Sequence, residues 1–147
     1  MKLFIGLGNP GNKYKNTRHN VGWMVLDRLV SSFQFPIESQ LPSFKFEKSF
    51  NAEVLKMQDV LLVKPQTFMN ESGKAVKKLV DFYKVDMDDL YVIHDDLDIK
   101  LGEYKIQKGV GPKVHGGVNS IENELGKEDF WRVRIGIDNR DSENKIS

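Results

Sequence analysis

Residues Gly6–Gly22 read Gly-Leu-Gly-Asn-Pro-Gly-Asn-Lys-Tyr-Lys-Asn-Thr-Arg-His-Asn-Val-Gly and follow the apolar run Leu3–Ile5. Three glycines, an asparagine and a proline at the end of a strand force a sharp turn and leave backbone N–H groups open there. Open α/β sheets bind their ligands at this end of the strands. The turn also brings Arg18, His19 and Asn20 to the start of an amphipathic helix. The stretch therefore predicts an active-site loop.

Dinucleotide binding is one interpretation of this loop, because its glycines fit the pattern Gly-x-Gly-x-x-Gly behind a strand. That motif needs a helix that starts within the glycines, whereas Pro10 and the polar residues after it delay the helix, with Thr17 as its predicted cap. The motif also needs an acidic residue about 20 positions on, at the end of a second strand. Asp27 instead falls within the predicted helix. We therefore expect no nucleotide cofactor.

The rest of the chain alternates between helical and strand patterns. The predicted elements are a helix from Val21 to about Gln34 that Pro36 stops, a hairpin of strands Ala52–Met57 and Val60–Lys64 around Gln58–Asp59, a helix Ser72–Lys84, a strand Leu90–His94 that ends in Asp95, a strand Glu103–Lys108, a helix Gly116–Leu125 closed by Gly126, and a strand Trp131–Asp138. Residues 37–49 stay unassigned. This order predicts an α/β fold, a three-layer sandwich with a mixed, mostly parallel sheet flanked by helices.

Length and composition favour a single domain. A chain of 147 residues buries about two-thirds of its unfolded surface without needing disulfides or metals. It contains no cysteine, which excludes a disulfide framework and a thiol nucleophile. No apolar run is long enough to cross a membrane. We therefore expect a cytoplasmic protein with no membrane partner.

Charge is nearly balanced overall but uneven along the chain. The formal net charge is +1, yet residues 84–98 carry one Lys against six Asp, and residues 99–118 carry four Lys against one Glu. A nucleic-acid binder of this composition depends on local basic patches. The alternative is a solvated acidic turn beside a solvated basic loop.

Four ordered motifs resemble those of the bacterial-type peptidyl-tRNA hydrolases. They are Gly6–Gly11 followed by Tyr14 and Thr17–Gly22, then Pro65–Gly73, His94–Asp98 and Phe130–Ile137. The resemblance implies one domain over residues 1–147 that hydrolyses the ester between peptide and tRNA in peptidyl-tRNA. It also implies a monomer without cofactor or metal. The family usually continues into further helices, one of which covers the substrate cleft, so the end at Ser147 predicts a domain that lacks them.

Hydrolysis of such an ester calls for an activated water, because the chain has neither a cysteine nor a Gly-x-Ser-x-Gly elbow to supply a nucleophile. Histidine is the usual general base near neutral pH. His94, at the end of an apolar run, is expected to be structural, and His115, in a Gly- and Lys-rich loop, to be solvated. The place of His19 after the glycine loop, and the resemblance, favour it as the base. Asp95 matches the family carboxylate that orients this base; the alternatives for His94–Asp98 are an acidic surface turn or a cation site.

Asn9, Asn70 and Asn119 match the family's three functional amides, and we assign Asn9 to catalysis. An amide donates and accepts hydrogen bonds, so these side chains can hold the ester carbonyl, the ribose or the attacking water without adding charge. The alternative for each is a turn or capping residue. Tyr14 and Phe68 match positions that contact the RNA end, where an exposed ring stacks on a base. The alternative for both rings is ordinary partial burial.

Arg134 matches a phosphate-binding arginine of the family, and the alternative is an outward, solvated side chain. The family's usual basic partner of this arginine falls at Gln107 here. Lys105 and Lys108 flank that position and are predicted to replace the partner. Met69 is predicted to line the substrate pocket, or else to pack in the core.

Val118 is a second departure from the family, which usually has histidine immediately before Asn119. With Gln107 and the end of the chain, this departure leaves an alternative from another class of protein. That alternative is a non-catalytic, splicing-factor-like RNA-binding module of the same fold. Turnover of peptidyl-tRNA distinguishes the enzyme from the module.

Overall fold

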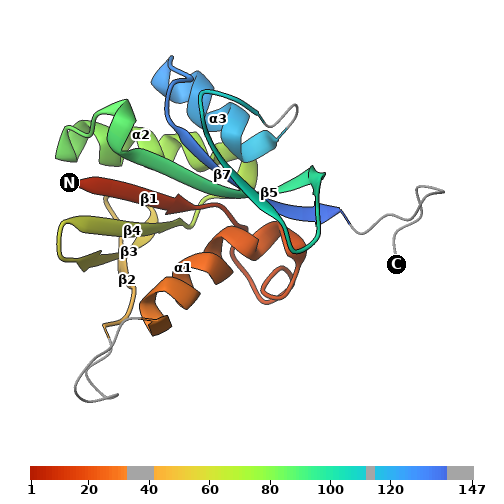
Figure 1. Cartoon of the computed structure of the whole chain (residues 1–147). Helices are drawn as coiled ribbons and strands as arrows, with labels where there is room; N and C mark the ends of the chain where they lie inside the picture. Colours follow the sequence, from red (N-terminus) through yellow and green to blue (C-terminus); the bar gives the residue numbers. More distant parts are fainter. Residues whose placement is uncertain (33–41, 112–114, 139–147) are drawn as a thin grey trace.

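The computed structural model describes residues 1–32, 42–111 and 115–138, which form a seven-stranded sheet with helices on both faces (Figure 1). The strands are β1 (Lys2–Gly6), β2 (Lys45–Glu47), β3 (Ala52–Met57), β4 (Val60–Pro65), β5 (Leu90–Lys100), β6 (Tyr104–Lys108) and β7 (Trp131–Asp138). The helices are α1 (Val21–Ser32), α2 (Ser72–Tyr83) and α3 (Gly116–Leu125), with short 3₁₀ turns η1 (Arg18–Asn20), η3 (Met69–Glu71) and η4 (Met87–Asp89). None of the helices in these ranges is long and apolar enough to cross a membrane.

Parallel pairing is confined to the centre of the sheet, whose strand order is β2-β3-β4-β1-β5-β7-β6. Strand β1 runs parallel to β4 and β5, and β5 runs parallel to β7. The pairs β2–β3, β3–β4 and β6–β7 are antiparallel. The predicted α/β fold with a mixed sheet between helices is confirmed. Because β1 runs parallel to β5 and ends opposite Ile93, the loop after β1 lies beside the residues that follow Ile93 in β5.

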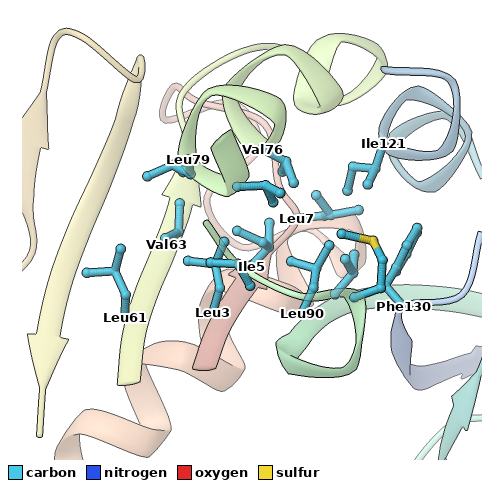
Figure 2. Close-up of a cluster of buried hydrophobic side chains, with 14 of the residues drawn as sticks. Leu3, Ile5, Leu7, Leu61, Val63, Val76, Leu79, Leu90, Ile121 and Phe130 are labelled. Carbon is cyan, nitrogen blue, oxygen red and sulfur yellow. The ribbon is translucent and has the colours of Figure 1, made fainter. Parts of the chain in front are cut away.

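Two apolar clusters hold the layers together, one on each face of the sheet. Alternation along β1 sends Leu3 and Ile5 to one face and Phe4 to the other. The larger cluster packs Leu3 and Ile5 against Val76 of α2 and Ile121 of α3 (Figure 2). The second cluster, beneath α1, is built on Leu26, Leu55, Leu62 and Ile93.

Close backbone packing, rather than phosphate binding, accounts for two glycines of the opening stretch. A Cβ on Gly6 would lie 2.5 Å from the carbonyl oxygen of Gly22, and a Cβ on Gly22 would lie 2.5 Å from the amide nitrogen of Leu7. The N–H of Leu7 in turn donates to the carbonyl of Ile93 at 2.9 Å. The first turn of α1 therefore rests directly on the end of β1 and on Ile93 of β5, which fixes the loop between β1 and α1.

Most predicted elements are confirmed, including the hairpin of β3 and β4, helices α2 and α3, and strands β6 and β7. Strand β5 differs, since it was expected to end at Asp95 but continues to Lys100. Its extension is held by β7, which pairs with it as far as Gly136 and again at Asp138 after an irregularity between Asp96 and Lys100. Residues Asp95–Lys100 are thus extended because they pair with β7, although their polar sequence does not favour a strand.

Three local differences complete the comparison. The Thr17 hydroxyl donates to the carbonyl of Tyr14 and makes no capping bond, although the helix does begin after the loop as expected. Strand β2 was not predicted, because it is only three residues long and all three are exposed. The expected helix end near Gln34 lies outside the described residues.

The contact between α2 and α3 predicts a strong effect of Gly73→Ala. The Gly73 N–H donates to the Ser120 hydroxyl at 2.9 Å, and a Cβ on Gly73 would lie 2.1 Å from the Ser120 carbonyl oxygen. We expect Gly73→Ala to lower the free energy of unfolding by about 2–3 kcal/mol through overpacking. Urea denaturation measures this change. Gly116→Ala is the matched control, because it adds the same methyl group near a helix start where the nearest atom is 4.0 Å away, and an equal loss in both variants would contradict the argument.

Candidate active site

A cavity of about 360 Å³ opens at the C-terminal ends of β1 and β5. Its walls come from the glycine loop, η1, η3, the end of β5 and the start of α3. The lining residues are Asn9, His19, Met69, Asp95, Asp96, Leu97, Asp98, His115 and Gly116. The predicted base, its predicted carboxylate partner and one predicted amide therefore share one cavity.

His19 and Asp95 form a short hydrogen-bonded pair in this cavity. Nδ1 of His19 lies 2.6 Å from Oδ2 of Asp95. The carboxylate accepts, so Nδ1 carries the hydrogen and the lone pair of the neutral ring is on Nε2. The His19 side chain is 62% exposed whereas that of Asp95 is 6% exposed. The imidazole is thus open to a water, while the group that orients it is shielded.

All three histidines of the chain bond to Asp95. His115 Nε2 lies 2.8 Å from Asp95 Oδ1, and His94 Nδ1 lies 2.8 Å from the Asp95 carbonyl oxygen. His94 is completely buried, as expected of a histidine at the end of an apolar run. The prediction that His115 is solvated was wrong, since its side chain is 9% exposed. Sequence spacing gave no sign of this contact, because 20 residues separate the two partners.

Burial and hydrogen bonding act in opposite directions on Asp95. Burial alone raises the pKa of a carboxyl group, but the hydrogen bond and charge interaction from His115, followed by those from His19, outweigh it and hold the pKa of Asp95 below its usual value. The carboxylate is therefore ionised at neutral pH. Burial lowers the pKa of His94 to about 4, so this ring is neutral beside it.

Asn9 is held by a reciprocal pair of hydrogen bonds with Asn20. The Asn9 N–H donates to Asn20 Oδ1 at 2.8 Å, and Asn20 Nδ2 donates to the Asn9 carbonyl at 3.0 Å. Asn9 Oδ1 accepts the N–H of Met69 at 2.6 Å, which leaves its Nδ2 as the group for a ligand. Sequence reasoning gave the buried Asn20 no role of its own. Its place directly after His19 was the available signal.

The other predicted contact residues surround the cavity at different distances. Met69 lines it, and the exposed Phe68 and Asn70 lie beside Met69 on the same short segment. The Asn70 Cβ is also the nearest atom to a Cβ built on Gly116, at 4.0 Å, which places Asn70 at the rim. Asn119 is exposed in the first turn of α3, and the half-buried Tyr14 belongs to the glycine loop; neither lines the cavity.

Two of the predicted phosphate ligands, Arg134 and Lys105, are cross-strand neighbours, whereas Lys108 lies apart from them. Arg134 is 12% exposed, and its Nε donates to Asp96 Oδ2 at 2.7 Å while its Nη1 donates to Gln107 Oε1 at 2.6 Å. Lys105 is exposed on β6 opposite Arg134. Lys108 pairs with Asp88 and lies opposite the first residue of β7, at the far end of the sheet from the cavity.

The acidic turn after His94 is bonded within the protein. Asp96 Oδ1 accepts a hydrogen bond from the Asp98 N–H, and Asp96 Oδ2 accepts one from Arg134 Nε. The Asp95 carboxylate likewise accepts hydrogen bonds from His19 and His115. Within the described ranges no group of three or more His, Cys, Asp or Glu side chains is arranged to hold a metal ion. All the carboxylate oxygens of Asp95 and Asp96 thus accept hydrogen bonds from protein groups.

An exposed imidazole, a buried carboxylate that orients it and an amide beside them are the parts of a hydrolase that activates water. The comparisons with known proteins agree with this class. A family model described as peptidyl-tRNA hydrolase matches residues 3–147. The chain belongs to the peptidyl-tRNA hydrolase family.

Individual relatives and structures support the assignment. The chain is 42% identical over 137 residues to the peptidyl-tRNA hydrolase of Oceanobacillus iheyensis, covering 93% of this chain and 71% of that protein. It is 41% identical over 138 residues to that of Bacillus cereus strain Q1, covering 94% and 72%. The crystal structure of the peptidyl-tRNA hydrolase from Acinetobacter baumannii superposes with a TM-score of 0.82 at 29% identity, covering 99% of this chain and 72% of the other.

The buried ring of His94 predicts a pH-dependent stability. Its pKa is about 4 in the fold and 6.5 ordinarily, so the unfolded chain binds the proton more readily. The stabilisation is complete above pH 6.5 and is lost as the pH falls toward 4. We expect the free energy of unfolding to drop by about 3 kcal/mol between pH 7 and pH 4 from this residue. Urea denaturation at several pH values measures it, and His94→Asn should flatten the curve; an equally steep curve in the variant would contradict the assignment.

Proposed function

We propose that this chain hydrolyses the ester between peptide and tRNA in peptidyl-tRNA, and releases free tRNA, by means of a water activated by His19. The observation that carries the proposal is the 2.6 Å pair of His19 and Asp95 at the mouth of the cavity. Family membership supports the same substrate class. A non-catalytic RNA-binding module would not need an exposed base with a buried orienting carboxylate.

The reaction follows from the positions of the donors and acceptors. His19 Nε2 takes a proton from a water whose oxygen attacks the ester carbonyl carbon, and Asp95 stabilises the imidazolium through Nδ1–H. Asn9 Nδ2 donates to the carbonyl oxygen as negative charge develops on it. The bond between the carbonyl carbon and the ribose oxygen then breaks. The imidazolium returns its proton to that oxygen, which yields a free peptide carboxyl group and a free tRNA.

Residues around the cavity are proposed to hold the substrate. The exposed ring of Phe68 is suited to stack on a base at the end of the tRNA, with Tyr14 as a second ring. Asn70, at the rim, and Asn119 are proposed to bond the ribose or the ester. Met69 supplies an apolar wall. Since every proposed catalytic group comes from one chain, we propose that the protein acts as a monomer, in the cytoplasm, without a cofactor.

Removal of the base tests this function directly. We expect His19→Ala to lower kcat on a peptidyl-tRNA by about 10²-fold or more while tRNA affinity stays nearly unchanged, because positioned proton transfer acts in the transition state. Single-turnover hydrolysis and a binding titration measure the two quantities. Ser31→Ala, at an exposed position on α1, is the control.

The same assay includes a metal test. Since Asp95 and Asp96 are bonded by protein side chains, we expect EDTA to leave the rate unchanged. A His19→Ala rate equal to that of the parent, or an activity that EDTA removes and a divalent ion restores, would refute the mechanism. Absence of any turnover by the parent chain would favour the RNA-binding module.

The place of Arg134 in RNA binding is tested by salt. If its guanidinium meets a phosphate, Arg134→Ala should reduce the slope of log affinity against log salt by about 0.7, the value for one phosphate of a single strand. That contact requires the arginine to leave Asp96, its partner at 2.7 Å. A titration of tRNA binding between low and moderate salt measures the slope, with Lys77→Ala on the exposed face of α2 as the control. An unchanged slope would remove Arg134 from the phosphate site and turn attention to Lys105.

A further inference from the structure

We propose that a second cavity, on the other side of the glycine loop from the cavity of His19, binds the peptide arm of the substrate. The second cavity has a volume of about 450 Å³. Its walls come from the glycine loop between β1 and η1, the first half of α1, and the paired ends of β3 and β4. The proposal rests on the proposed function and assigns a place to the part of the substrate that lies beyond the ester.

The glycine loop is a wall that the two cavities share. Asn9 lines the cavity that contains His19, and the next two residues, Pro10 and Gly11, line the second cavity. An extended peptide advances about 3.3–3.6 Å per residue, so a peptide whose ester carbonyl meets Asn9 passes this loop within about two or three residues. The second cavity is therefore within reach of a short peptide that is bound for hydrolysis.

The strand order separates the second cavity from the proposed phosphate ligands. The second cavity lies toward β4 and β3, on one side of β1. Arg134 of β7 and Lys105 of β6 lie on the other side, beyond β5. The peptide and the RNA of a peptidyl-tRNA are joined only at the ester, so the two arms leave the reacting carbon in different directions. With the RNA arm over β7 and β6, the direction of β4 and β3 is left for the peptide arm.

The charges of the second cavity do not suit a phosphate backbone. Its cations, Lys15 and Lys64, are balanced by the carboxylates of Asp27 and Glu53. The Lys64 Nζ donates to Asp27 Oδ1 at 2.5 Å and lies 4.2 Å from the centroid of the Phe44 ring. Binding of RNA phosphates depends on positive charge that the protein has not already neutralised. The cavity has no such surplus, and its carboxylates repel phosphates.

The uncharged groups of the second cavity match the parts of a peptide. The amide side chains of Asn12, Asn16 and Gln66 donate and accept hydrogen bonds, as peptide groups do. Trp23 and Met24 add apolar surface, since the Trp23 ring is half-buried against the glycine loop and Met24 is 39% exposed. Amides recognise a peptide backbone whatever its sequence. We therefore expect the cavity to accept varied peptides and to favour an apolar side chain beside Met24.

Substrate length tests this site. Two substrates carry the same tRNA and the same last amino acid: an N-acetylaminoacyl-tRNA, which is too short to reach the second cavity, and an N-acetylated tetrapeptidyl-tRNA, which is long enough. We expect Met24→Ala to raise KM for the longer substrate about fivefold through the lost apolar contact, and to leave KM for the shorter one unchanged. Steady-state hydrolysis of both substrates measures the two values.

Phe82→Ala is the matched control for Met24→Ala. It also removes an exposed apolar side chain from a helix, but Phe82 lines neither cavity. We expect it to leave both KM values unchanged. A Met24→Ala variant that changes KM equally for the two substrates, or for neither, would overturn the proposal.

A second measurement needs no hydrolysis. The chain has two tryptophans: Trp23 lines the second cavity, and Trp131 lies at the opposite end of the sheet, where its Nε1 donates to the carbonyl of Asp88. The probe is N-acetyl-alanyl-leucyl-alanyl-alanine amide, added to the His19→Ala chain. We expect NMR to show a shift of the Trp23 indole N–H signal, no shift of the Trp131 signal, and weaker binding when Met24→Ala is added.

The two measurements distinguish failure of this inference from failure of the proposed function. A selective shift of the Trp23 signal, together with no turnover of peptidyl-tRNA by the parent chain, would support the peptide site and refute the hydrolysis. Turnover by the parent chain without a shift of the Trp23 signal, or with an equal shift of both indole signals, would overturn the peptide site and leave the hydrolysis standing.

Discussion

The site depends on one ionised carboxylate that is kept out of water. A buried charge is costly unless hydrogen bonds replace its hydration. The Asp95 carboxylate receives two such bonds, from His19 and His115, and the backbone carbonyl of Asp95 separately accepts a bond from His94. Since each imidazole comes from a different part of the chain, satisfying this one group draws the glycine loop, β5 and the start of α3 together. The hydrogen bonds that stabilise the buried charge thus also bring together the segments that form the cavity.

The sheet order makes this meeting possible. Strand β1 lies between β4 and β5 and ends opposite Ile93, so the loop that follows it passes over the middle of β5. Because Gly22 has no side chain, its backbone packs directly against the backbone of Leu7 and Ile93, and this brings η1 within reach of Asp95. On the opposite face, the close approach of α2 and α3 at Gly73 places η3 and the first turn of α3 on two sides of the cavity. The packing of the helices against the sheet therefore sets the distance between polar groups on opposite walls of the cavity.

Much of this could be predicted from the sequence, because local patterns carry it. The helices and strands follow from periodicity, and His19, Asp95 and Asn9 follow from a loop at a strand end together with a family resemblance. The length of β5 could not be predicted, since a partner strand and not its own residues sustains it. The contact of His115 with Asp95 and the bonding of Arg134 to Asp96 were also out of reach. Both join residues 20 or more positions apart, and spacing does not record which side chains converge after folding.

The convergence of every histidine on one residue has a consequence for how substitutions combine. Asp95 accepts hydrogen bonds from His19, His94 and His115, so these three rings share one partner. Substitutions at residues that share a hydrogen-bond network do not have additive effects. The effect of replacing any one of the three rings therefore depends on whether the other two still hold Asp95.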